Sequence, residues 1–261
     1  LTATDRDTAD VFGRAVSLSD DGTTALIGAS GNDSAYIFTE SGGSWSQQQK
    51  LSATDGDGGG LFGNSVSLSD DGTTALIGAF ESAFIFTKSG GRWDQQQKLT
   101  AANGTGNFGS VTTANDGTTV LIGVLSDENS NGDRAGSAFV FTKANGSWSQ
   151  QQKLIATDGD SQDNFGRSVS LSADGTTAVI GADSDGNSNG DRAGSTYVFN
   201  RSDGSWSQQQ KLTASDGGSN DFFGRSVSVS DDGTTALIGA AFASANGSSA
   251  GSAYVFTSER V

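Results

Sequence analysis

The stretch DDGTTALIGA occupies residues 20–29 and recurs unchanged at residues 70–79 and 231–240. Near-copies are ANDGTTVLIGV at residues 114–124 and SADGTTAVIGA at residues 172–182. Four of the five copies follow a run that alternates Ser with Val or Leu, and all of them end in Gly and a small apolar residue. Asp-Gly between two such runs is typical of a β-hairpin, because a type I′ turn needs positive φ at both central positions. The sequence therefore predicts the same hairpin five times.

Two further segments complete each repeat: a run rich in aromatic and β-branched residues, such as AYIFT at residues 35–39, and then WSQQQKL or WDQQQKL. The Trp-Gln segments begin at Trp45, Trp93, Trp148 and Trp206. A Phe-Gly pair opens each repeat, with its Phe at Phe12, Phe62, Phe108, Phe165 and Phe223. Four short antiparallel strands per repeat, without any helix, predict an all-β protein with the architecture of a five-bladed β-propeller. We expect a single domain over residues 1–261, with repeats at residues 11–54, 61–102, 107–157, 164–215 and 222–261 together with 1–4.

The two ends of the chain complement each other. The chain begins with Leu-Thr-Ala, which elsewhere closes the Trp-Gln strand, and it ends on a third strand that no Trp-Gln segment follows. We therefore expect Leu1–Ala3 to complete the last blade and to close the ring. Five repeats of a larger ring remain the alternative. Because the chain starts in mid-repeat without Met, we expect a processed or trimmed segment, and the loss of a leader peptide stays open.

The composition excludes several kinds of partner and chemistry. Asp and Glu number 30 against 15 Lys and Arg, so the net charge is −15, which disfavours nucleic acid and anionic membranes as partners. Such an acidic surface suits a halophilic protein. The chain has no Cys and no His, which removes disulfides, zinc–thiolate sites and the usual general base. No apolar run approaches the roughly 18 residues of a membrane helix, so we expect no membrane insertion.

The Phe-Gly pair before one strand and the IGA at the end of the next resemble the FG-GAP repeat of integrin α-chain propellers and of many secreted prokaryotic proteins. The resemblance covers essentially the whole chain. GSAYVFT at residues 251–257 and GSWSQQQKLTA at residues 204–214 are most similar to the prokaryotic variant, especially its haloarchaeal members. The resemblance implies a β-propeller and an extracellular or cell-surface location. Integrin-type repeats carry a calcium loop between the first two strands, but SDDGTT at residues 19–24 is too short to wrap a cation.

Candidate calcium ligands lie instead between the second and third strands of repeats three and four. There, D-x-N-x-N-G patterns place oxygen-bearing side chains at alternate positions before a Gly, as a hard cation requires. The candidate ligands are Asp127, Asn129, Asn131, Asp133, Asp183, Asp185, Asn187, Asn189 and Asp191. The alternative is an Asn- and Gly-rich surface turn. Further acids precede most Phe-Gly pairs, and we interpret these as solvated loop residues or weak cation sites.

Residues that directly follow Phe-Gly form a second candidate site. If the first strand of each repeat is innermost, these residues ring one mouth of the central channel: Arg14, Asn64, Arg167 and Arg225. Such a partial arginine ring is suited to an anion, and pairing with neighbouring acids is the alternative. The Trp side chains are expected to join adjacent blades or, alternatively, to stack on sugars. Gln side chains are expected to protect an edge strand that a partner could also extend.

Five N-x-[ST] sequons predict N-glycosylation if the protein is exported, at Asn32, Asn103, Asn145, Asn200 and Asn246. Near-identical repeats favour multivalent binding over one asymmetric active site. We therefore expect a non-enzymatic extracellular binding or adhesion module that recognises glycans or partner proteins. A structural subunit of a surface layer, filament or appendage, self-assembling through blade edges, is the alternative, and a glycoside hydrolase is a more distant one.

Overall fold

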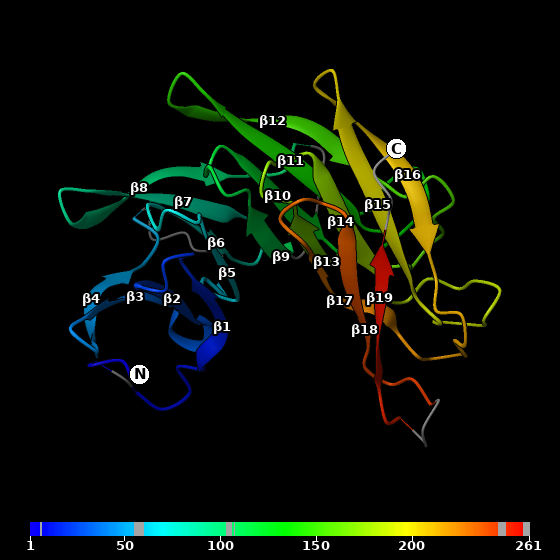
Figure 1. Ribbon diagram of the computed structural model, residues 1–261, viewed down its shortest axis with the longest axis horizontal. Helices are drawn as coiled ribbons and strands as arrows, with labels where there is room; N and C mark the ends of the chain where they lie inside the picture. The colour runs from blue at the N-terminus through cyan, green and yellow to red at the C-terminus, as the bar shows by residue number, and fades with distance from the viewer. Residues whose placement is uncertain (6, 55–59, 103–105, 107, 245–248, 258–261) are drawn as a thin grey trace.

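The computed structural model describes the chain except for residues 6, 55–59, 103–105, 107, 245–248 and 258–261, and its strands form five antiparallel sheets (Figure 1). We number these sheets as blades one to five in chain order. Blade one contains β1 (Phe12–Leu18), β2 (Thr24–Ala29), β3 (Ser34–Ser41) and β4 (Ser44–Leu51). Blade two contains β5 (Ser65–Leu68), β6 (Thr74–Gly78), β7 (Ala83–Ser89) and β8 (Arg92–Leu99). Blade three contains β9 (Phe108–Thr113), β10 (Thr119–Val124), β11 (Ser137–Ala144) and β12 (Ser147–Leu154).

Blade four contains β13 (Phe165–Leu171), β14 (Thr177–Ala182), β15 (Ser195–Ser202) and β16 (Ser205–Leu212). Blade five has three strands among the described residues: β17 (Phe223–Val229), β18 (Thr235–Ala240) and β19 (Ser252–Thr257). The all-β propeller prediction is confirmed. The sequence predicts no helix, and the described part of the chain contains only a single 3₁₀ turn, η1 (Ser30–Asn32).

The Asp-Gly hairpins form as predicted, but their turn type was predicted wrongly. In blade one the amide of Gly22 donates to the carbonyl of Ser19 at 2.9 Å, and Gly22 has a φ of 68°. Asp21 does not have positive φ; its carboxylate instead accepts from the amide of Thr23 at 2.9 Å and from the hydroxyl of Ser19 at 2.6 Å. This is a type I turn followed by a left-handed glycine, which the carboxylate stabilises.

The blades pack face to face around a central axis. The innermost strands β1, β5, β9, β13 and β17 contact one another in succession. Each interface buries an apolar core: Leu26 and Ile37 of blade one, for example, pack against Val66 and Trp93 of blade two. Of the four Trp residues, those of blades two to four are buried, at Trp93, Trp148 and Trp206. The structure therefore supports the prediction that Trp joins neighbouring blades.

Glycine explains the recurring FG and IGA motifs. In four blades the Phe-Gly pair occupies the two central positions of a tight turn. The Gly has a φ near +88°, as the third position of a type II turn requires, at Gly13, Gly63, Gly166 and Gly224. The Gly of IGA faces the next blade, and a Cβ on Gly181 would lie 1.9 Å from the carbonyl oxygen of Gly224. These contacts set how closely consecutive blades approach.

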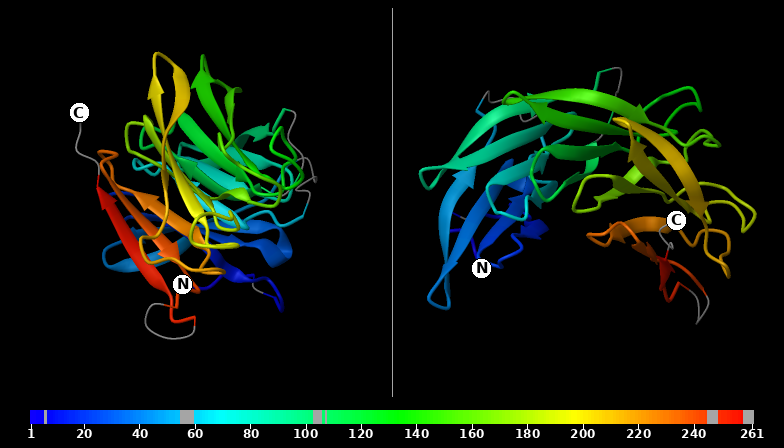
Figure 2. Two further views of the ribbon diagram at one scale, coloured as in Figure 1. Left: turned by 90° about the vertical axis from the view of Figure 1, so that its right-hand side faces the viewer. Right: turned by 45° about the horizontal axis from the view of Figure 1, so that its top comes forward.

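The five blades follow an arc whose first and last members stand apart (Figure 2). Among the described residues, β17 and β1 do not pack against each other as successive inner strands do. Val16 and Leu18 on blade one are 70% and 55% exposed, and Leu237 and Val255 on blade five are 49% and 65% exposed. Leu1–Ala3 lie outside any strand, and Ala3 packs on blade one. Ring closure by these residues is therefore not confirmed.

Candidate functional site

The channel mouth is lined by the residue that follows Phe-Gly in every blade. In four of the blades this residue ends a tight turn, as where the amide of Arg14 donates to the carbonyl of Val11 at 3.1 Å. This turn directs the side chain inward at the start of the innermost strand. One hollow of about 590 Å³ is lined by all five of them: Arg14, Asn64, Ser110, Arg167 and Arg225. The structure thus brings the four predicted ring residues together, and it adds Ser110, which a search for charged residues misses.

Two of the three arginines at the mouth share one buried carboxylate. Asp183, whose side chain is 4% exposed, lies 3.6 Å from Nε of Arg167 and 3.3 Å from Nη1 of Arg225. Arg14 donates from Nε to the side-chain oxygen of Asn64 at 3.2 Å. Three guanidinium groups therefore face one carboxylate and one amide, so the mouth carries excess positive charge in a strongly acidic protein.

The opposite end of the inner strands is acidic. Each inner strand leads into an Asp-Gly turn, and the amide of Asp20 donates to the carbonyl of Asp70 at 3.0 Å, which joins the turns of blades one and two. Burial raises the pKa of Asp70, and the carboxylates of Asp20 and Asp231 act in the same direction. The inner strands therefore carry arginines at one end and carboxylates at the other.

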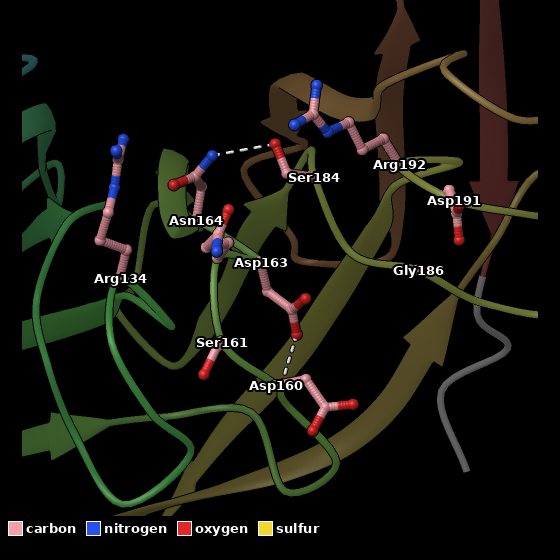
Figure 3. Close-up of a pocket in the computed structure, with 10 residues that line it drawn as sticks. Arg134, Asp160, Ser161, Asp163, Asn164, Ser184, Gly186, Asp191 and Arg192 are labelled. Atoms are coloured by element: carbon pink, nitrogen blue, oxygen red, sulfur yellow. Dashed lines mark hydrogen bonds between the residues drawn. The ribbon is translucent and has the colours of Figure 1, made fainter.

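A second cleft of about 590 Å³ lies between the loops of blades three and four (Figure 3). Its walls carry Arg134 and Arg192 together with Asp160, Asp163 and Asp191. The carboxylate of Asp163 is directed at Asp160, whose amide donates to it at 2.6 Å. Burial raises the pKa of Asp163 to about 7, and the charge of Asp185 adds to the effect.

The sequence predicts solvated acidic residues before Phe-Gly, but three of these residues are buried. Asp10, Asp163 and Asp221 are 7%, 5% and 5% exposed, respectively. Each accepts a hydrogen bond from the backbone amide three residues earlier, at 2.6 to 2.7 Å. For these three residues the solvated interpretation is wrong, because each carboxylate bonds to a backbone amide of its own loop and is buried there. The loops of Asp163 and Asp221 also bond to the preceding blade.

The predicted calcium loops use their polar side chains to hold their own backbone. Asn129 donates from Nδ2 to the carbonyl of Gly136 at 2.6 Å, and Asn131 donates to the carbonyl of Ala156 at 2.7 Å. Buried Asp127 accepts from the hydroxyl of Ser137 at 2.6 Å and lies 2.7 Å from Nζ of Lys153.

Blade four repeats the same pattern. Asn187 bonds to Gly194, Asn189 bonds to Ala214, and Asp185 bonds to Ser195. Lys211 lies 3.1 Å from Asp185. Of the remaining candidate ligands, Asp133 and Asp191 are exposed. Within the described ranges, no group of three or more acidic, His or Cys side chains is arranged to hold a metal ion. Calcium ligation stays a prediction.

The predicted glycosylation sites differ in accessibility. Asn145 and Asn200 are exposed, whereas Asn32 is half-buried and donates to the hydroxyl of Tyr36 at 3.3 Å. Asn103 and Asn246 lie outside the described residues. Among the described residues, no helix is long and apolar enough to span a membrane.

A repeated set of blades around a channel with one ring of equivalent residues defines a β-propeller repeat protein. The sequence model of the FG-GAP repeat matches residues 1–42, 45–91, 93–141, 148–199 and 206–256. The chain therefore belongs to the FG-GAP repeat family. From the second match on, each unit begins with or close to a fourth strand and continues into the next blade.

The fold is shared with distant solved structures. Hydrazine synthase from Kuenenia stuttgartiensis matches with a TM-score of 0.61 and 14% sequence identity, over 92% of this chain. The match spans 58% of the hydrazine synthase chain, so this chain corresponds to little more than half of that one. At this identity the likeness concerns the fold alone. No curated protein sequence matches the chain.

Proposed function

We propose that the protein is a non-enzymatic extracellular binding module that takes an anionic group, carried by a glycan or a partner protein, at its channel mouth. The observation that carries the proposal is the convergence of Arg14, Arg167 and Arg225 on one hollow. Guanidinium groups match carboxylates in shape and charge, and they remain charged at any physiological pH. A cationic hollow in a protein of net charge −15 concentrates anions at that place.

The lining of the hollow favours binding over catalysis. A glycoside hydrolase of the usual kind needs two carboxylates beside the scissile bond. The described residues that line the hollow include no Asp or Glu. The nearby carboxylate of Asp183 is paired with the guanidinium groups of Arg167 and Arg225. Exposed sequons at Asn145 and Asn200 are compatible with an exported protein.

Calorimetry with a uronic acid and its neutral parent sugar tests this proposal. We expect the uronate to bind and the neutral sugar not to bind. Arg167→Gln should weaken uronate binding about tenfold, because a charge-assisted hydrogen bond is lost. Arg92→Gln is the matched control, since its side chain is 76% exposed on β8 and pairs with Asp94. Equal binding of both sugars, or an unchanged affinity in Arg167→Gln, would contradict the proposal.

A specific observation also favours assembly as a second function. Val16 and Leu18 on one end, and Leu237 and Val255 on the other, are exposed apolar residues at positions that are mostly buried between interior blades. The two ends therefore present the two halves of the interior interface. Exposed apolar area of this kind marks interaction surfaces.

Light scattering tests assembly through these ends. We expect the molar mass to rise with protein concentration, and more steeply at high salt, because salt screens repulsion between acidic copies. Leu18→Asp should keep the protein monomeric. The control is Val11→Asp, since Val11 is 54% exposed in a loop whose equivalent in blade two, Leu61, is also exposed. A concentration-independent monomer mass for the unaltered protein would exclude this function.

A further inference from the structure

Blade five presents an unpaired strand edge. Within the described part of the chain, β19 pairs with β18 on one side and with no strand on the other. In the other four blades the third strand pairs with β4, β8, β12 or β16, each of which reads W-[SD]-Q-Q-Q-K-L. A third strand in this fold is therefore built to receive a fourth.

A glutamine clasp joins the fourth strands of neighbouring blades. Gln49 donates from Nε2 to the carbonyl of Trp93 at 2.7 Å and accepts from the amide of Trp93 at 2.9 Å. The same two bonds join Gln97 to Trp148 at 2.8 and 2.9 Å, and Gln152 to Trp206 at 2.8 and 2.9 Å. The fourth member of this series, at the same position of β16, is Gln210. Its backbone pairs with Val198 of β15, but its side chain is exposed and makes no hydrogen bond to any described residue, so its clasp is open.

An apolar pocket lies where the indole of a fifth Trp would fit. Trp206 of blade four packs against Val140 and Leu154 of blade three and against Leu171 and Phe199 of its own blade. The corresponding positions one blade further on are Val198, Leu212, Val229 and Phe256. These four residues line one pocket of about 90 Å³, together with Gln210. The walls of a tryptophan site are thus present without the tryptophan.

Blade five also carries the two residues that hold the Lys of a fourth strand in other blades. Nζ of Lys211 lies 5.3 Å from the ring centroid of Tyr197 and 2.8 Å from Asp158. Lys50 is placed in the same way, 5.5 Å from the ring of Tyr36 and 2.7 Å from Asp5. The equivalents in blade five are Tyr254 and Asp216, whose hydroxyl and carboxylate are 2.8 Å apart.

We propose that the edge of β19 is an acceptor site for an extended polypeptide strand of the pattern Trp-Ser-Gln-Gln-Gln-Lys-Leu. The incoming strand pairs antiparallel with β19 in the register of β15 and β16, which places its Lys opposite Tyr254 and its third Gln opposite Val255. Its indole fills the pocket, its Trp backbone closes the clasp with Gln210, and its Lys lies over Tyr254 near Asp216. Backbone pairing supplies affinity, and these three side-chain sites supply specificity. The proposal is independent of the anion site at the channel mouth.

Binding of a labelled peptide to the whole chain tests the proposal. The probe is fluorescein-labelled Ser-Trp-Ser-Gln-Gln-Gln-Lys-Leu, followed by fluorescence anisotropy. We expect saturable binding of one peptide per chain, and about tenfold weaker binding when Ala replaces the Trp of the peptide. Gln210→Ala should weaken binding about tenfold through the loss of two hydrogen bonds. The control is Gln209→Ala on the same strand, because that side chain donates to Ser207 and lies outside the pocket.

Three results would overturn the proposal. The first is the absence of binding at millimolar peptide, and the second is equal binding of the Trp and Ala peptides. The third is self-association of the chain that the peptide does not reverse, which would make a second copy the occupant of this edge. A second variant, Ala236→Leu, is needed in case Gln210→Ala impairs folding. The larger side chain fills the pocket and leaves Gln210 unchanged. Ala236→Leu should weaken binding of the peptide. Circular dichroism and the melting temperature show whether the variant is folded.

Discussion

Gly181→Ala is expected to lower the free energy of unfolding by about 3 kcal/mol, because a core that is already packed must accept an additional methyl group. The new Cβ would lie 1.9 Å from the backbone oxygen of Gly224, which belongs to the innermost strand of the next blade. A backbone atom in that position cannot rotate away as a flexible side chain can. The change should appear as a lower midpoint in urea or in thermal unfolding.

Gly186→Ala is the matched control for this substitution. Gly186 is exposed in the loop after β14, has no neighbour within 4 Å of an added Cβ and does not have positive φ. Alanine there should leave stability unchanged or raise it slightly. Equal midpoints for Gly181→Ala and the unaltered protein would mean that the blades are not held at the separation described above.

Trp148→Ala is expected to cost about 4 kcal/mol, as is usual for truncation of a large buried aromatic residue. Trp148 is 5% exposed between blades two and three. Trp45→Ala should cost about 1 kcal/mol, since Trp45 occupies the same position in blade one but is only half-buried. Urea unfolding of the two variants side by side measures the difference.

This comparison also reports on the ends of the arc. If the two substitutions destabilise the protein equally, the outer face of blade one is covered in solution, either by blade five or by a second copy. If they differ as expected, that face is open. The pair of variants therefore tests whether this face of blade one is open in solution.

Sequence patterns predict this fold well where they depend on local chemistry. Asp-Gly, the aromatic third strand and the Trp-Gln strand all identify their elements, since each reflects turn geometry or strand burial within one blade. The ring position after Phe-Gly is also predictable, because the first strand of each repeat is innermost. Arg14 and Arg225 lie far apart in sequence and yet line one hollow.

Features that depend on contacts between blades are not predictable in this way. The three consecutive Gln residues around Gln48 suggest a protected strand edge. In the structure, however, Gln49 bonds to the backbone of the next blade. Gln48 is the residue of a β-bulge, between two paired positions. Asn129 and Asn131 fit a calcium pattern, but the pattern does not reveal that their amide nitrogens donate to the chain itself. Ring closure depends on the angle between blades, which no segment of sequence encodes alone.

Arginine side-chain NMR during titration with a uronic acid tests the central claim, that the channel mouth binds an anion, most directly. We predict that the Nε–Hε signals of Arg14, Arg167 and Arg225 shift together and saturate at one equivalent, while those of Arg92 and Arg201 stay in place. Spectra in which none of the three signals moves, or in which all five move alike, would contradict an anion site at the channel mouth.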